Sequence, residues 1–194
     1  MHASYVVIVL NMYTENMGIS YTPGEYADEM VQEFCARAHI DSQTCYNAVK
    51  LFKKISNKLS GLNKTGLRAA CIYTICKQNG VPRTMGEIAG VTGCCMKQLG
   101  KYESLLNQKH YPVTPEDYIE RFSRKLGLKF RQIKIIHEKI TKYKIEHPYI
   151  NPAAVTCCCI YNTFPKLVDM KKISEISGVP VSSIKRLNKK NNIM

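Results

Sequence analysis

The sequence predicts an all-α protein made of two tandem repeats of five helices each, and two observations support this. One is the run from Gly66 to Ile75, in which apolar residues recur at helical spacing and the intervening residues are also small or apolar. A helix that is apolar nearly all round is buried on every side, so this run is expected at the centre of a helical bundle. The other is that the same unit occurs again further along the chain.

The repeat is visible as matched residues at an offset of 88 positions. Ile72-Tyr73 is matched by Ile160-Tyr161, and the offset is expected to continue without a gap. The further pairs are Phe34 and Phe122, Asn63 and Asn151, Glu87 and Glu175, Ile88 and Ile176, Gly90 and Gly178, Val91 and Val179, Lys97 and Lys185, Leu99 and Leu187, and Lys101 and Lys189. Such agreement predicts two helical units built on one plan.

The predicted organisation has four parts. They are an N-terminal segment at 1–24, a first repeat at 25–106, a linker at 107–114 and a second repeat at 115–194. Pro23-Gly24 indicates the turn before the first repeat, and Pro112 and Pro115 bound the polar linker. The N-terminal segment fits a terminal packing element and a functional linker equally well.

The five helices of the first repeat follow from caps, breakers and apolar spacing. The first starts near Tyr26 and ends around His39, and the second is capped by Asp41 or Ser42. The third is the buried one, which Gly80 and Pro82 end. Thr84 and Glu87 form a capping box for a fourth helix over Met85 to Ala89, and the fifth runs from about Cys94 to Leu106.

The second repeat follows the same plan. Thr114 is expected to cap its first helix, with Asp117 in a box-like position. Pro152 opens the buried third helix, which continues through Tyr161. The fourth helix covers Met170 to Ser177, and the fifth follows the Gly178-Val179-Pro180 turn and reaches about Lys190. This last pair predicts a helix-turn-helix.

The charge of the chain favours an anionic partner. The 28 Lys and Arg exceed the 15 Asp and Glu by 13, and the sequence pI is near 9.3. Nucleic acid is the first candidate and an acidic membrane surface the second. On the last helix, Lys185, Arg186, Lys189 and Lys190 share one broad face while Ile184 and Leu187 face the core. A basic face on the second helix of such a pair suits insertion into a DNA groove.

The nine cysteines form neither a disulfide framework nor a zinc site by pattern. Cys94-Cys95 and Cys157-Cys158-Cys159 are contiguous, and no Cys-x-x-Cys pair exists. We expect reduced structural thiols, no zinc ribbon and no cofactor in this chain. The apolar stretch from Tyr5 to Leu10 is too short for a secretory signal or a membrane span.

Several separate stretches resemble transcription factor IIB and its archaeal counterparts. They are Gly80-Val81-Pro82-Arg83-Thr84 with Glu87-Ile88, Met96 to Lys101, Pro115 to Phe122, and Asn151 to Val155 with Ile160-Tyr161. The resemblance covers about Tyr26 to Lys190. It implies two cyclin-like repeats that clamp a TATA-box-binding protein on promoter DNA, with the second repeat placing its helix-turn-helix in the major groove.

The resemblance also implies the residues that contact DNA. It places the base-reading pair of the second repeat on Ser182 and Lys185, where the family has a Val and an Arg. Lys can contact guanine but lacks the Arg fork, so sequence preference is weaker than phosphate binding. The DNA-binding residues expected in full are Asn63, Lys64, Lys97, Lys101, Ser182, Ser183, Lys185, Arg186, Lys189 and Lys190.

The function implied is that of a general transcription initiation factor, a monomer that bridges promoter DNA, TATA-box-binding protein and RNA polymerase. The family's zinc ribbon and reader segment have no room in Met1 to Gly24, so the chain is either a core fragment or a reduced homologue. The implied location is the nucleus, or the cytoplasm for a viral or archaeal protein. The Lys-, Asn- and Tyr-rich composition suits a large DNA virus or a reduced eukaryote.

Three rival classes are weaker. A kinase-regulating cyclin shares the fold, and the basic last helix argues against it. An enzyme lacks support because there is no Gly-rich phosphate loop and no carboxylate pair where a cleft could be inferred. His137 fits a polar surface or core role better than catalysis, and Cys94, at a helix N-terminus, has no evident His partner. A polybasic membrane protein would carry its charge on a lipid-facing amphipathic segment rather than on these helices.

Overall fold

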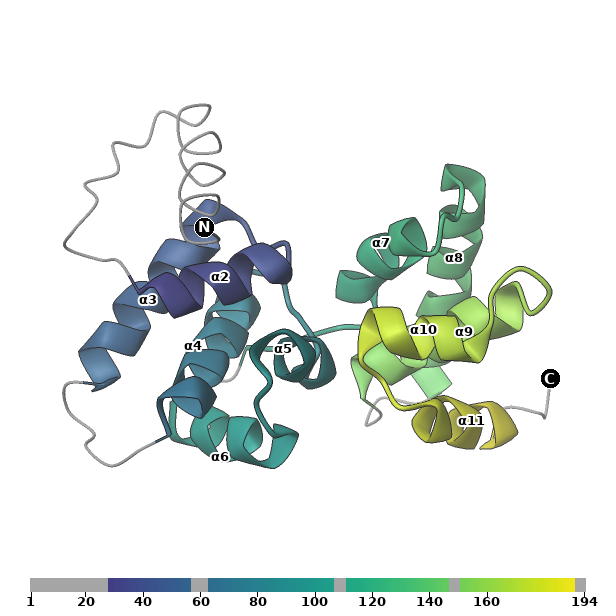
Figure 1. Ribbon diagram of the computed structural model, residues 1–194. Helices are drawn as coiled ribbons and strands as arrows, with labels where there is room; N and C mark the ends of the chain where they lie inside the picture. Colours follow the sequence, from purple (N-terminus) through teal and green to yellow (C-terminus); the bar gives the residue numbers. More distant parts are fainter. Residues whose placement is uncertain (1–27, 57–62, 107–110, 147–150, 191–194) are drawn as a thin grey trace. The chain divides into compact units, whose positions relative to one another are not determined.

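The computed structural model describes residues 28–56, 63–106, 111–146 and 151–190, and this part of the chain is built of helices with no strand (Figure 1). The helices are α2 (Glu29–Arg37), α3 (Ser42–Ser56), α4 (Lys64–Gln78), α5 (Met85–Thr92), α6 (Met96–Leu106), α7 (Glu116–Lys125), α8 (Phe130–Glu146), α9 (Pro152–Thr163), α10 (Met170–Ser177) and α11 (Val181–Lys190). The all-α prediction is confirmed. The predicted segment 1–24 and part of the linker lie outside the described residues.

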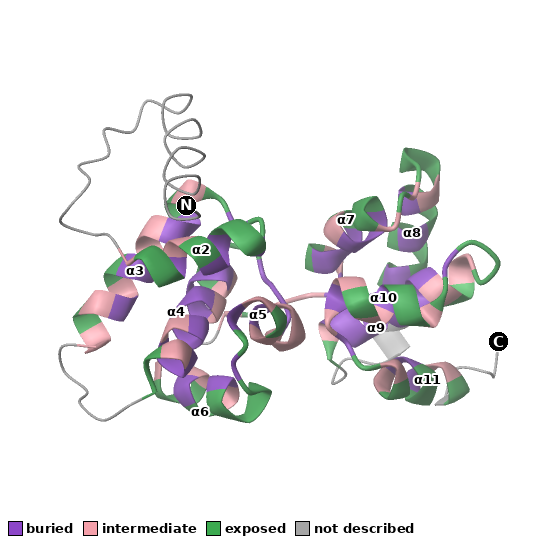
Figure 2. Cartoon of the chain, in the orientation of Figure 1, coloured by how far each residue is buried: buried purple, intermediate pink, exposed green. Residues whose placement is uncertain are grey.

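The chain divides into two compact units. Unit 1 comprises Met1–Asn79 and Ile88–Lys109, and unit 2 comprises Gly80–Glu87 and His110–Met194. Within unit 1 the central helix α4 packs against α2, α3 and α6, and within unit 2 the central helix α9 packs against α7, α8, α10 and α11. Figure 2 shows both central helices largely in the colour of buried residues.

Both central helices are buried because their sequences offer no polar face. Leu67, Ala70, Cys71 and Ile72 in α4 are at most 2% exposed, and every residue from Ala153 to Ile160 in α9 is buried. Each helix starts at an Asn whose side chain accepts a hydrogen bond from the backbone. Asn63 accepts from the Gly66 amide at 2.9 Å, and Asn151 accepts from the Ala154 amide at 3.2 Å.

Several predicted caps are present. Thr84 and Glu87 form the reciprocal capping box, since the Thr84 amide donates to Glu87 Oε2 and the Glu87 amide donates to Thr84 Oγ1. Asp41, rather than Ser42, caps α3 by accepting from the Thr44 amide at 2.8 Å. The cap predicted at Thr114 is not formed as expected: the Thr114 amide donates to Asp117 Oδ2 at 2.7 Å, but the residue that directly precedes α7 is Pro115, which makes no side-chain cap hydrogen bond.

The offset of 88 holds through the first two helices of each repeat and into the third, since α4 and α9 start 88 positions apart. The corner after α2 and the corner after α7 have the same geometry. The Ile40 amide donates to Cys35 O at 2.9 Å, and the Leu128 amide donates to Ser123 O at 3.0 Å. His39 and Gly127 adopt positive φ at these matched positions, 50° and 76°.

The prediction that the offset continues at 88 to the end of the repeat is wrong. The left-handed turn before α6 lies at Gly93 (φ 67°) and the one before α11 at Gly178 (φ 65°), which are 178 − 93 = 85 positions apart. In each turn a hydroxyl accepts from the backbone: Thr92 Oγ1 from the Cys94 amide, and Ser177 Oγ from the Val179 amide. The cause is the length of the central helix, 15 residues in α4 and 12 in α9.

The offset of 85 changes which residues correspond. Ile88 matches Ile173, Leu99 matches Ile184 and Tyr102 matches Leu187, and all six are buried. The predicted pairing of Lys97 with Lys185 and of Lys101 with Lys189 is therefore wrong. Lys97 corresponds to Ser182, and Lys101 corresponds to Arg186.

The segment Gly80–Glu87 is expected within the first repeat but groups with unit 2. Arg121 of α7 donates to the Glu87 carboxylate and, through Nη2, to Pro82 O at 2.9 Å. Thr84 Oγ1 donates to Ser177 O at 2.5 Å. Gly86 and Gly178 meet backbone to backbone, so closely that a Cβ on either would overlap the other. This segment is therefore part of the packing of unit 2.

Candidate nucleic-acid interface

The α10–α11 pair is fixed by apolar residues on its inner side and by the turn between its helices. Ile173, Val179, Ile184 and Leu187 belong to the apolar core of unit 2. Gly178 takes the left-handed conformation that ends α10, which a residue with a side chain adopts at a cost. The Ser183 amide donates to Pro180 O at 2.9 Å, which begins α11. The predicted helix-turn-helix residues thus lie on two helices joined by a short turn.

The outer side of α11 is basic. Ser182, Lys185, Arg186 and Lys189 are exposed, and Ser183 is half-buried. Within the described residues no carboxylate pairs with these three cations. Lys190 ends the helix, and its side chain lies outside the described residues. Four of the six predicted residues of this helix are therefore available together on one exposed face.

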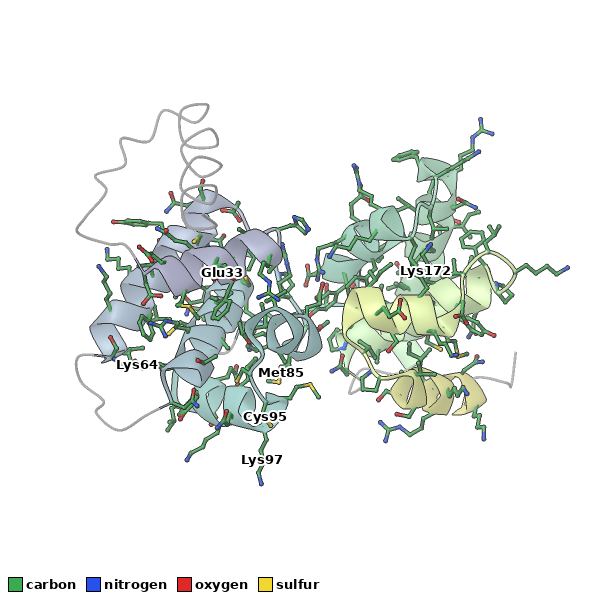
Figure 3. All side chains as sticks on the ribbon, viewed as in Figure 1. Glu33, Lys64, Met85, Cys95, Lys97 and Lys172 are labelled. Carbon is green, nitrogen blue, oxygen red and sulfur yellow. The ribbon has the colours of Figure 1, made fainter. Side chains whose placement is uncertain are left out.

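The predicted residues of unit 1 lie on α4 and α6. Asn63 is exposed at the start of α4, but its side-chain oxygen caps that helix, and its amide donates to Tyr102 Oη of α6 at 3.2 Å. Lys64, Lys97 and Lys101 are exposed. Figure 3 shows Lys97 pointing outward from its helix. The Asn63–Tyr102 bond joins the start of α4 to α6, so the helices that carry these lysines are held together in one unit.

Two further cations, absent from the predicted set, lie on α10. Lys171 and Lys172 are exposed in the first turn of α10, and Figure 3 shows Lys172 projecting from that helix. At the offset of 85, Lys172 stands where the first repeat has Glu87. In the sequence these cations are visible as a Lys-Lys pair before the apolar Ile173. The offset of 88 gives no reason to single them out, because it matches Glu87 with Glu175 and not with Lys172.

Several features of the described residues bear on the enzyme and membrane-protein alternatives. No three Cys, His, Asp or Glu side chains there are grouped so that they could hold a metal ion. Burial raises the pKa of Cys94, which disfavours the thiolate that a nucleophile requires. His137 is exposed on α8. No described helix is both long enough and apolar enough to cross a membrane.

Comparison with known proteins gives one consistent result. Residues 22–110 match the family model described as the transcription factor TFIIB repeat. The chain is 29% identical over 172 residues to transcription initiation factor IIB of Encephalitozoon cuniculi, an alignment that covers 82% of this chain and 55% of the relative. It is 28% identical over 148 residues to the protein of that name from Xenopus laevis, covering 70% of this chain and 46% of the relative.

An archaeal protein is similar to the same degree. The transcription initiation factor IIB of Archaeoglobus fulgidus is 30% identical over 138 residues, which is 66% of this chain and 42% of the relative. The chain therefore spans about half the length of the curated relatives it matches.

Proposed function

Since the chain belongs to the transcription factor IIB family, we propose that it is a general transcription initiation factor that bridges promoter DNA, a TATA-box-binding protein and RNA polymerase. The observation that carries the proposal is the exposed basic face of α11, which follows a short turn and has an apolar inner side. This is the arrangement by which a helix-turn-helix places its second helix in a major groove. The role is non-enzymatic, and the chain acts as a monomer.

On α11, each exposed residue has a task that suits its chemistry. Arg186 and Lys189 neutralise backbone phosphates, and Lys185 is placed one turn into the helix, where it reaches a guanine edge. Ser182, in the first turn, is short and lets the helix approach the bases closely. Lys171 and Lys172 on α10 add phosphate contacts beside the groove.

In unit 1, Lys64, Lys97 and Lys101 supply a second set of phosphate contacts. Asn63 contributes by holding the start of α4 in place, because its side-chain oxygen already caps that helix. With cations on both units, attachment to DNA is largely electrostatic, and the TATA-box-binding protein supplies the position on the promoter.

The test is binding to a TATA-containing duplex across a salt series, with and without a TATA-box-binding protein. We expect cooperative, salt-sensitive ternary binding. The Lys185→Ala/Arg186→Ala variant should bind more weakly, with the slope of log affinity against log salt reduced by about 2.

The matched control removes two exposed lysines elsewhere, Lys50→Ala/Lys54→Ala on α3. Both variants lose two positive charges, so a general charge effect would weaken both equally. If the two variants lose the same DNA affinity, α11 is not the DNA-binding helix. Absence of DNA binding in every combination would reject the proposed function and favour the kinase-partner cyclin.

A further inference from the structure

The start of α8 differs from the start of α3, although the two helices correspond. Ser42 and Phe130, the first residues of these helices, are 130 − 42 = 88 positions apart, and the corners before them share one backbone geometry. In the first repeat the corner reads Asp41-Ser42-Gln43, and in the second it reads Lys129-Phe130-Arg131. The same scaffold therefore carries an acidic, polar corner in one repeat and a basic, aromatic corner in the other.

Phe130 is the most exposed of the large apolar residues described. Its relative exposure is 79%, against 0% for Phe122 in the same unit. The cations around it in sequence, Lys129, Arg131 and Lys134, are all exposed. Lys134 lies one helical turn after Phe130 and so shares its side of α8.

The Phe130 ring contributes neither to the cap of α8 nor to the core of unit 2. The cap of α8 is made by Gln132, whose Oε1 accepts from the Lys129 amide at 2.7 Å, and the cap of α3 is made by Asp41. The core of unit 2 uses Ile133, Ile136 and Ile140 of α8 and not Phe130. An exposed phenyl ring contributes little to stability, so its place among cations points to a ligand.

The charge of the corner selects an anionic ligand. Within the described residues, no carboxylate forms an ion pair with Lys129, Arg131 or Lys134, although Glu138 lies one turn further along α8. A protein partner would need a sizeable apolar centre to exclude water. The only other large apolar residue exposed on α8 in the described part is Ile135, at 41%. A single exposed ring flanked along the helix by exposed cations suits a flat, anionic ligand better.

We propose that Lys129, Phe130, Arg131 and Lys134 form a platform for single-stranded nucleic acid, on which one base stacks against the Phe130 ring while the three cations hold the adjoining phosphates. Proteins that bind single strands without sequence preference combine aromatic rings with basic surfaces in this way. The platform lies on α8 and not on α11, the helix proposed for duplex DNA, and it does not depend on that function.

The chain contains no Trp, and this makes stacking directly observable. Phe130→Trp introduces a single indole fluorophore at the platform. We expect an oligothymidylate of about 12 nucleotides to quench the emission of this indole, and to do so less as salt is raised. The control is Ser42→Trp, which puts the same fluorophore at the corresponding position of the first repeat, beside Asp41. Its emission should be nearly unchanged by the oligonucleotide.

Substitutions at Phe130 separate stacking from other kinds of contact. We expect Phe130→Ala and Phe130→Leu each to weaken binding of a labelled oligothymidylate about tenfold, the loss of one stacked base, and Phe130→Trp to retain it. Thermal unfolding of all variants should match the parent, because the ring is outside the core.

Three results would overturn the proposal. If Phe130→Leu binds as well as the parent, the ring makes an ordinary apolar contact. If Lys129→Ala/Lys134→Ala weakens binding but Phe130→Ala does not, the attraction is purely electrostatic. If the Phe130→Trp variant shows neither quenching nor oligonucleotide binding, the platform does not exist. The duplex assay on Lys185→Ala/Arg186→Ala is read separately, so failure of either proposal leaves the other testable.

Discussion

Arg121 has a dense set of contacts within unit 2, and its pairing shows why burial decides the strength of an ion pair. It donates to the Glu87 carboxylate and to Pro82 O, and its guanidinium lies over the Phe122 ring at 4.8 Å. The side chains of Arg121 and Glu87 are only 17% and 10% exposed. Removing Arg121 would leave a carboxylate with little access to water and without its closest partner.

We expect Arg121→Ala to lower the free energy of unfolding by about 2–4 kcal/mol, measured by denaturant unfolding. The matched control is Arg124→Ala, on the same helix. Arg124 pairs with Glu120, but these side chains are 73% and 52% exposed, so the loss should be at most about 0.5 kcal/mol. Similar losses in the two variants would show that the Glu87 contact does not stabilise the unit.

At the scale of the elements, the turns before α6 and α11 share one backbone conformation, but the atoms around the two turns differ. Gly93 and Gly178 both have positive φ, but a Cβ on Gly93 would meet nothing within 4 Å, whereas one on Gly178 would lie 2.5 Å from the Glu87 amide nitrogen. The obstacle at Gly178 is backbone, which cannot rotate away as a side chain can.

We expect Gly93→Ala to cost about 1 kcal/mol, the conformational penalty alone, and Gly178→Ala to cost several kcal/mol in denaturant unfolding. Gly86→Ala should resemble Gly178→Ala, because its Cβ would overlap the carbonyl oxygen of Gly178. Gly90→Ala, within α5 and with no neighbour in reach, is the control and should be neutral or slightly stabilising. Equal costs at Gly93 and Gly178 would contradict the close approach of Gly86.

At the scale of the whole molecule, the sequence is a good guide to everything that local pattern controls. Continuous apolar runs predict the buried α4 and α9, and short polar motifs predict the cap at Thr84. The basic side of α11 follows from helical spacing alone. Each of these depends on residues a few positions apart, where periodicity and capping act.

Other features depend on tertiary packing and could not be predicted in this way. Chance identities such as Lys97 and Lys185 fit an offset of 88, and only the lengths of α4 and α9 show that the true offset becomes 85. The packing of Gly80–Glu87 with unit 2 depends on contacts with Arg121 and Ser177, which are distant in sequence. The exposure of Phe130 is likewise invisible in a sequence where apolar residues are expected inside.

The buried thiols of both units make the stability of the molecule sensitive to alkaline pH. Burial raises the pKa of Cys71 in unit 1, and of Cys157 and Cys159 in unit 2, from 9.0 to about 12. Above pH 9 the unfolded chain therefore loses these protons while the folded chain keeps them. Because the unfolded state then binds fewer protons, stability falls as pH rises from about 9 towards 12.

We expect each such thiol to reduce the free energy of unfolding by about 1 kcal/mol between pH 8 and pH 10, measured by guanidinium unfolding under reducing conditions. Cys71→Ala removes one of these thiols, whose pKa is raised by burial. Between pH 8 and pH 10 the free energy of unfolding of this variant should therefore fall by about 1 kcal/mol less than that of the parent. Cys95→Ala, which removes a thiol at an exposed position, is the control for the substitution itself. All other ionisable groups are common to the parent and the Cys71→Ala variant, so only the difference between the two curves reports the thiol. Parallel curves for Cys71→Ala and the parent would mean that Cys71 remains protonated to the same extent in both states.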